Sequence, residues 1–228
     1  SWDILVSGDD ATRIVYSQTA DTGAWVVERV ESLDKVRGNF LLSDWDNDSW
    51  QELIYQASGK PQTIRLAGAA LDKEVTTSLD TTGKAVAAAD FDLDGKLDAL
   101  TLSDGQWQTH RNVTESDAHH LAVRFRGIDD NNANSGRVNH YAIGSVVEVR
   151  FGPHYRAQVI TTPTTHFGLD GFDKAASLRV IFPNGLTQTI REPAIDTLVE
   201  EEQTLKGSCP YLYAWDGEKF AFVTDCLW

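Results

Sequence analysis

Two short stretches of the sequence carry acidic residues at alternate positions, and no other pattern in the chain points as clearly to chemistry. Residues 90–98 read DFDLDGKLD, with carboxylates at positions 1, 3, 5 and 9 and glycine at position 6. A calcium ion takes about six to eight oxygen ligands, and one loop of this kind supplies several, helped by the carbonyl at position 7 and a sharp turn at glycine. The ligands predicted for this loop are Asp90, Asp92, Asp94, the carbonyl of Lys96, and Asp98.

A second stretch, residues 44–52, repeats this arrangement one unit earlier in the chain. It places Ser49 where the turn prefers glycine, so we expect backbone strain and weaker calcium binding than in the later loop. Position 12 of the later loop is Thr101 and a strand follows it, so neither loop is an EF-hand. The alternative is an acidic surface turn, but converging carboxylates repel one another without a cation. The predicted ligands of the earlier loop are Asp44, Asp46, Asp48, the carbonyl of Trp50, and Glu52.

No residues in the sequence are predicted to be catalytic. The six histidines lie between residues 110 and 166, but adjacent His119 and His120 point to opposite faces of a strand, so a structural role is favoured over a transition-metal site. There is no Gly-x-Ser-x-Gly nucleophile motif, and neither cysteine has an electropositive setting. The sequence therefore offers no evident set of residues for nucleophilic catalysis.

The elements that would position the two loops are all strands. Short alternating apolar runs recur every eight to twelve residues, which is typical of an all-β fold. Acidic residue, apolar strand and glycine turn repeat from Asp3, Glu52 and Asp98, spaced 49 and 46 residues apart, the length of a four-stranded propeller blade. Residues 1–112 are thus predicted to form about two and a half blades of a partial β-propeller, with residues 38–42 and 86–89 as the fourth strands of the first two.

The remainder of the chain is predicted to form a small antiparallel β-sandwich over residues 118–192, followed by an acidic connector at 193–206. Residues 207–228 begin a further β element, a hairpin that turns at Asp216–Gly217. That turn would bring Cys209 and Cys226 near each other, so either a disulfide or two small buried side chains is expected there. The aromatic side chains of this hairpin are expected to pack in its core rather than stack on a sugar.

Charge and composition narrow the classes of partner. With 20 basic and 34 acidic residues the net charge is −14. This balance argues against a nucleic-acid partner, because phosphate binding needs a basic face. A 41% hydrophobic content argues against disorder, and no apolar run is long enough to span a bilayer. The chain has no methionine, which predicts a piece of a longer protein whose remaining blades lie elsewhere.

The sequence resembles two known families in succession. The acidic loops, with their preceding strands at 40–44 and 87–90, resemble the calcium-binding repeats of FG-GAP and VCBS propellers. The segments at 139–144, 166–169 and 178–185 resemble the ASPIC/UnbV domain, which follows such a propeller in the cartilage acidic protein-like family. The resemblance implies that His166 fixes a loop.

What the resemblance implies is a calcium-binding module for adhesion or interaction, secreted, at the cell surface or periplasmic, with an unidentified protein or glycan partner. A different class stays open, because UnbV-type relatives occur in biosynthetic gene clusters and imply a cofactor-free enzyme. Convergent acid and base groups with perturbed pKa values in a central pocket would favour that enzyme. A carbohydrate-binding propeller is the third alternative.

Overall fold

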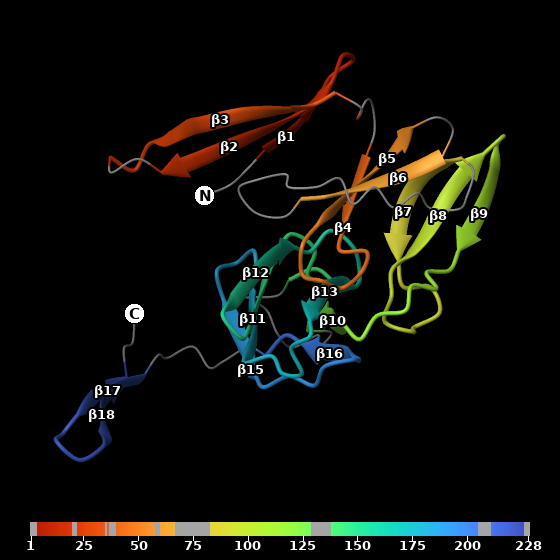
Figure 1. Cartoon of the computed structure of the whole chain (residues 1–228). Helices are drawn as coiled ribbons and strands as arrows, with labels where there is room; N and C mark the ends of the chain where they lie inside the picture. The colour runs from red at the N-terminus through yellow and green to blue at the C-terminus, as the bar shows by residue number, and fades with distance from the viewer. Residues whose placement is uncertain are drawn as a thin grey trace.

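In a computed structural model, every regular element of the described residues is a β-strand, and none is a helix. The all-β prediction is therefore confirmed. The strands form six small sheets, arranged as in Figure 1. The residues that the structure describes are 4–19, 22–34, 36, 40–57, 60–66, 83–128, 138–204 and 211–225.

The first half of the chain folds into three antiparallel sheets, each made of three strands in chain order. The first sheet contains β1 (Ile4–Ser7), β2 (Thr12–Thr19) and β3 (Trp25–Leu33). The second contains β4 (Phe40–Ser43), β5 (Glu52–Ala57) and β6 (Lys60–Arg65). The third contains β7 (Lys84–Ala89), β8 (Asp98–Ser103) and β9 (Gln106–His110).

The strand assignment of the predicted blades needs correction. Residues 38–42 and 86–89 were expected to end the first and second blades, but β4 pairs with β5 and β7 pairs with β8, so each opens the following sheet. The reason is local, because each acidic loop is the short connection between two strands, and a short connection makes its flanking strands antiparallel neighbours. The sheets described have three strands rather than four, and the predicted strand at 74–77 lies outside the described residues.

The three sheets pack on one another through alternate residues of the middle sheet. On β5, Leu53 and Tyr55 pack with Ile14 and Leu33 of the first sheet. Ile54, which points the opposite way, packs with Ala99 of the third sheet. Side chains alternate across a strand, so a sheet that is apolar on both faces can be buried between two neighbours. The second sheet is therefore the central layer of a stack.

The second half of the chain forms a two-sheet sandwich. One sheet has the strand order β13-β10-β16 and the other β12-β11-β14-β15. Both sheets contribute to one core. It contains Phe125 and Phe167 from the sheet β13-β10-β16, and Val149 and Leu178 from the sheet β12-β11-β14-β15. The strands are β10 (His119–Arg126), β11 (Val146–Phe151), β12 (His154–Val159), β13 (Thr165–Asp170), β14 (Ser177–Ile181), β15 (Thr187–Arg191) and β16 (Leu198–Glu202).

The prediction of an acidic connector at 193–206 is partly wrong, because this segment contains β16. The prediction of an antiparallel sandwich also needs correction, because β16 pairs in parallel with β10. Acidic side chains had suggested a solvated segment. Val199, however, packs against the sandwich core, and Glu200 accepts hydrogen bonds from Arg124 and Arg126 of β10. Apolar burial on one face and charge pairing on the other explain why this acidic run forms a strand.

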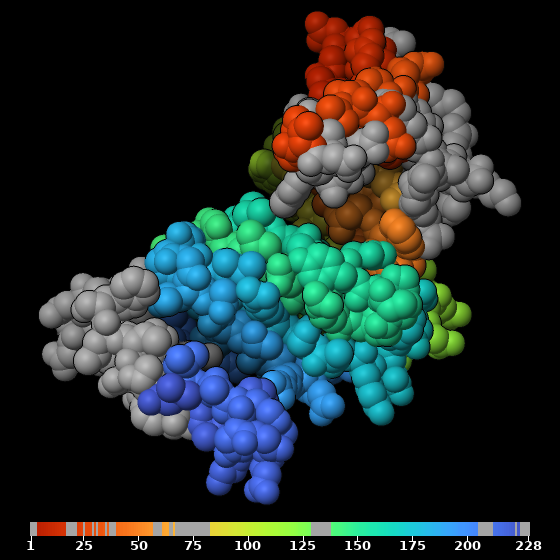
Figure 2. Space-filling model, turned by 90° about the vertical axis from the view of Figure 1, so that its left-hand side faces the viewer, coloured from red at the N-terminus to blue at the C-terminus, as the bar shows by residue number. Residues whose placement is uncertain are grey.

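The predicted C-terminal hairpin is present as β17 (Tyr211–Trp215) and β18 (Phe220–Asp225). Its turn is held by Asp216, whose Oδ1 accepts the amides of Glu218 and Lys219. The aromatic side chains of Tyr213, Trp215 and Phe220 do not form the buried core that was expected, since they are 53%, 59% and 70% exposed. Figure 2 shows the hairpin projecting from one end of the molecule, opposite the first sheet. Cys209 and Cys226 lie outside the described residues, so their predicted pairing stays a prediction.

Among the described residues, no helix has the length and apolar character needed to cross a membrane.

Candidate metal centre

The two acidic loops share one backbone conformation. We call residues 44–52 the first acidic loop, between β4 and β5, and residues 90–98 the second acidic loop, between β7 and β8. Positive φ angles occur at the fourth and sixth positions of both, at Asn47 (63°) and Ser49 (72°) and at Leu93 (62°) and Gly95 (86°). Ser49 thus adopts the left-handed conformation that favours glycine, as the sequence predicted.

In each loop the structure brings the first three predicted carboxylates together. Asp44, Asp46 and Asp48 each offer one ligand atom within 4.8 Å of the others, and Asp90, Asp92 and Asp94 form an equivalent group. Backbone amides inside the loop hold some of these side chains, as where Trp50 donates to Asp48 Oδ1. Clustered carboxylates of this kind offer the hard oxygen ligands that divalent cations such as calcium prefer.

Two carboxylates of the first acidic loop are buried with one oxygen unsatisfied. Asp44 and Glu52 are only 3% and 5% exposed. Asp44 Oδ2 accepts the amide of Gly168 and Glu52 Oε2 accepts the amide of Trp45, whereas Asp44 Oδ1 and Glu52 Oε1 have no hydrogen-bond partner among the described residues. A buried, unpaired carboxylate oxygen is costly, so this arrangement is suited to a cation.

Burial also changes the proton affinity of these two groups. Burial, reinforced by the charges of Asp48 and Asp46, raises the pKa of Asp44 to about 7. Burial raises the pKa of Glu52 to about 9, although the hydrogen bond from the Trp45 amide acts in the opposite direction. In the absence of a cation, Glu52 therefore favours the protonated form near neutral pH, and Asp44 is about half protonated there.

The second acidic loop is more open and better satisfied. Asp90 accepts the amides of Asp94 and Gly95, one on each oxygen. Arg111 forms an ion pair with Asp92 and a second, at 3.6 Å, with Asp94. Its positive charge offsets part of the repulsion that the three carboxylates exert on one another.

The ninth position differs between the loops. Asp98, a predicted ligand, is buried, and its two oxygens accept the amides of Phe91 and Asn112. Those bonds tie the start of the second loop to the segment between β9 and β10. Neither Asp98 nor Glu52 belongs to the three-carboxylate groups, and of the two only Glu52 keeps an unpartnered oxygen.

The first acidic loop is also a contact surface for the sandwich. The carbonyl of Asn47 accepts the amide of Asp170 at 2.8 Å, and Asn47 Nδ2 donates to the carbonyl of Gly95 in the second loop. Asn47 Oδ1 must therefore be an acceptor, and it lies 2.7 Å from Nε2 of His166. Burial lowers the pKa of His166 to about 3, so the ring is neutral and carries its proton on Nε2.

Arg156 of β12 supports the strained turn of the first acidic loop. Its Nε donates to the carbonyl of Ser49 at 2.7 Å and its Nη2 to Ser49 Oγ at 3.1 Å. Its guanidinium also lies over the ring of Trp50, 4.6 Å from the centroid. Two charge-assisted hydrogen bonds and a cation–π contact help to offset the cost of placing serine in the left-handed region.

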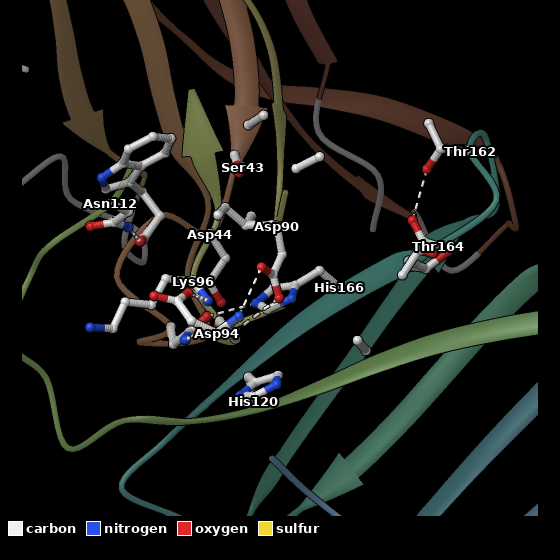
Figure 3. Close-up of a pocket in the computed structure, with 18 of the residues that line it drawn as sticks. Ser43, Asp44, Asp90, Asp94, Lys96, Asn112, His120, Thr162, Thr164 and His166 are labelled. Atoms are coloured by element: carbon white, nitrogen blue, oxygen red, sulfur yellow. Dashed lines mark hydrogen bonds between the residues drawn. The ribbon is translucent and has the colours of Figure 1, made fainter. Parts of the chain in front are cut away.

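Both loops border a cavity of about 1040 Å³ between the stacked sheets and the sandwich. Figure 3 shows Asp44, Asp94 and His166 close together on one side of it, with His120 on β10 below them. The rings of His120 and His166 are stacked with centroids 5.5 Å apart. Thr162 and Thr164, which are also labelled, belong to the segment between β12 and β13.

Several residues that shape the site were not found from the sequence. Arg156, Gly168 and Asn112 contact the loops from positions distant in the chain, and Asn112 Nδ2 donates to the carbonyl of Trp45. His166 had been expected to fix a loop, and it contacts the first acidic loop. No spacing rule links Arg156, Gly168 or Asn112 to the acidic loops, so the local sequence gave no signal that these three residues contact them.

Comparison with known proteins bears on the sandwich. Residues 135–206 match the ASPIC and UnbV family model. The match includes every strand of the sandwich except β10, and it includes His166, Gly168 and Arg156, which contact the first acidic loop. We call residues 135–206 the ASPIC/UnbV segment. No curated protein and no solved structure matches the chain.

Proposed function

We propose that this chain is a calcium-binding interaction module without catalytic activity, in which propeller blades of the FG-GAP/VCBS type precede the ASPIC/UnbV segment. The observation that carries the proposal comes from the first acidic loop. Asp44 groups there with Asp46 and Asp48, and the buried oxygens Asp44 Oδ1 and Glu52 Oε1 have no hydrogen-bond partner among the described residues. Repulsion and burial there are both relieved by a divalent cation with oxygen ligands.

The stacked sheets support the propeller part of this proposal. Each of the second and third sheets begins with a strand, an acidic loop and a second strand, so the loops occur at the same place in successive layers. Successive layers are packed face to face through apolar residues, as blades are. Secretion, exposure at the cell surface or a periplasmic location belongs to the same proposal, because calcium there is abundant enough for loops of modest affinity.

A binding role is favoured over the enzymatic alternative by what the titratable groups already contact. Asp44 and His166 both line the cavity and have shifted pKa values. Asp44, however, accepts the Gly168 amide, and His166 donates to Asn47, so each is engaged in holding the loop to the sandwich. Groups used in this way are poorly placed to exchange protons with a substrate.

Titration calorimetry with calcium on the whole chain tests the proposal. Two sites are expected, with Asp46→Asn removing the first and Asp92→Asn the second. If the affinity is near about 10⁻⁴ M, as in extracellular modules, then about 1 mM calcium stabilises the fold by roughly 1.4 kcal/mol per site. That corresponds to about 3 to 6 °C in Tm per site. Identical calorimetric and melting curves with calcium and with chelator would disprove the proposal.

A further inference from the structure

The first acidic loop contacts the sandwich through both its backbone and its side chains. A simple cation site does not require such contacts. We propose that this loop is a cation-dependent joint, in which an ion bound by Asp44, Asp46 and Asp48 holds the ASPIC/UnbV segment against the sheet β4-β5-β6. The inference rests on the proposed function, since it takes cation binding in this loop as given.

Asp44 is the residue that links the ion to the sandwich. One oxygen accepts the Gly168 amide of β13 at 3.0 Å, and the other is buried with no hydrogen-bond partner among the described residues. The Asp44 carboxylate also groups with those of Asp46 and Asp48. An ion bound to the free oxygen keeps the carboxylate in this position. Without the ion, the unpartnered oxygen of Asp44 makes no hydrogen bond that would fix the carboxylate in this position. The hydrogen bond to Gly168 then weakens.

Asn47 provides the second link. It lies between the ligands Asp46 and Asp48, so convergence of those side chains on an ion fixes its backbone at a φ of 63°. In this conformation its carbonyl accepts the amide of Asp170, and its side chain joins His166 to the second acidic loop. The orientation of one peptide therefore depends on occupancy of the loop and determines a contact with β13.

Gly168 packs so closely against the first acidic loop that a side chain has no room there. A Cβ atom on Gly168 would overlap Asp44 Oδ2 and the backbone of Asn47. By contrast, Gly171, three residues along the same segment, has nothing within 4 Å of the corresponding position and no left-handed φ. The two glycines therefore form a matched pair, one inside the joint and one outside it.

Amide hydrogen exchange on the intact chain tests the joint directly. Calcium at about 1 mM is expected to slow exchange of the Gly168 and Asp170 amides at least tenfold relative to chelator. Asp92→Asn should retain this protection, whereas Asp46→Asn, which removes a ligand of the first loop only, should lose it. The Ile160 amide, bonded to Ser145 inside the sandwich, provides a control whose exchange should change by less than about twofold.

The reverse coupling is tested by calcium affinity, because linkage between two events is reciprocal. Asp92→Asn chains leave only the first loop for calorimetry. In that background Gly168→Ala should weaken calcium binding about tenfold, and Gly171→Ala should leave it unchanged. If Gly168→Ala does not fold, the exchange comparison in the wild-type chain decides alone.

The two proposals fail in different ways. Calcium binding to the first loop without protection of Gly168 and Asp170 would overturn the joint and leave the proposed function standing. The same conclusion would follow if a folded Gly168→Ala chain bound calcium as tightly as its Gly171→Ala counterpart. Absence of any calcium binding to the wild-type chain would overturn both.

Discussion

Glu52 and Asp44 are carboxylic acids in places where water cannot solvate their charge. Each satisfies one oxygen with a backbone amide and leaves the other buried without a partner. Such a group must either bind a proton or meet a cation, because an isolated buried charge is too costly. Proton and cation therefore compete for the same oxygens of the first acidic loop.

This competition predicts how stability depends on pH. In chelator, the folded chain holds a proton on Glu52 up to about pH 9, whereas the unfolded chain releases it near pH 4.5. The folded state then binds more protons, so the free energy of unfolding should fall by about 3 kcal/mol between about pH 6.5 and 8.5. Glu52 accounts for most of this fall, and Asp44, whose pKa of about 7 lies in the same range, adds to it. His166, whose pKa is lowered from 6.5 to about 3, opposes this change by less than about 0.5 kcal/mol, because its ring is half protonated in the unfolded chain at pH 6.5 and neutral in the folded chain.

Urea unfolding at the two pH values measures this effect. Glu52→Gln should remove most of the dependence in chelator and leave the smaller part that comes from Asp44. Calcium should flatten the dependence in the wild-type chain. A wild-type chain that becomes more stable from pH 6.5 to 8.5 in chelator would contradict the prediction.

A glycine in the second acidic loop gives another prediction at the scale of single residues. Gly95 has a φ of 86°, and a Cβ there would overlap the ring of His120, which is stacked on His166. Gly105 has a similar φ of 76° in the turn between β8 and β9, with open space around it. Gly105→Ala should therefore cost only the left-handed backbone penalty of about 1 kcal/mol, and Gly95→Ala about 2 kcal/mol more.

Denaturant titration of the two variants makes the comparison. Gly105→Ala is the control, since it carries the same backbone strain without the steric overlap. Equal stability of the two variants would show that the second loop does not pack on β10 as described.

Among the elements, β16 is the strand that was not predicted from the sequence, because three of its five residues are glutamates. It extends the sheet β13-β10 by a parallel pairing along β10, from Ala122 with Leu198 to Arg126 with Glu202. Val199 of β16 and Ile195, which precedes the strand, pack against the sandwich core. Two partly buried apolar side chains and a row of ladder hydrogen bonds outweigh the cost of bringing three glutamates to the sheet edge.

Truncation tests the contribution of this element. Removing residues 193–228 deletes β16 and the hairpin β17-β18, exposes the edge of β10, and should lower Tm by at least about 8 °C. Removing only residues 207–228 should change Tm by less than about 2 °C, because the hairpin stands apart from the sandwich in Figure 1. Differential scanning calorimetry measures both, and similar Tm values for the two truncations would show that β16 is dispensable.

For the molecule as a whole, the stacked sheets depend on neighbours on several sides. The first sheet exposes Val26, Val27 and Val30, and the second contacts the sandwich through the first acidic loop. Layers that bury their faces only against one another lose stability when a neighbouring layer is removed.

Residues 1–110 expressed alone are therefore not expected to form a stable monomer. Size-exclusion chromatography and thermal melting should show association or a broad transition, whereas the whole chain should melt cooperatively at the same concentration. A monomeric fragment with a cooperative transition would contradict the proposed propeller arrangement.

Local sequence was sufficient to identify the strands, the acidic loops and the hairpin turn. Alternating apolar residues specify a half-buried strand, and alternating carboxylates with Ser49 or Gly95 at the sixth position specify a turn with left-handed residues. These signals lie within a few residues of one another. The all-β class and the convergence of Asp44, Asp46 and Asp48 followed from them.

Tertiary structure alone determined which strands share a sheet and what surrounds each loop. Whether β4 ends one sheet or opens the next depends on which neighbour completes its hydrogen bonds, and periodicity is the same in both cases. Asp44 accepts the amide of Gly168 and Ser49 is held by Arg156, and both partners lie more than a hundred positions away in the chain. The sequence therefore indicated two similar acidic loops, and only long-range packing made one of them buried and unsatisfied, because solvation depends on the whole fold and not on the loop.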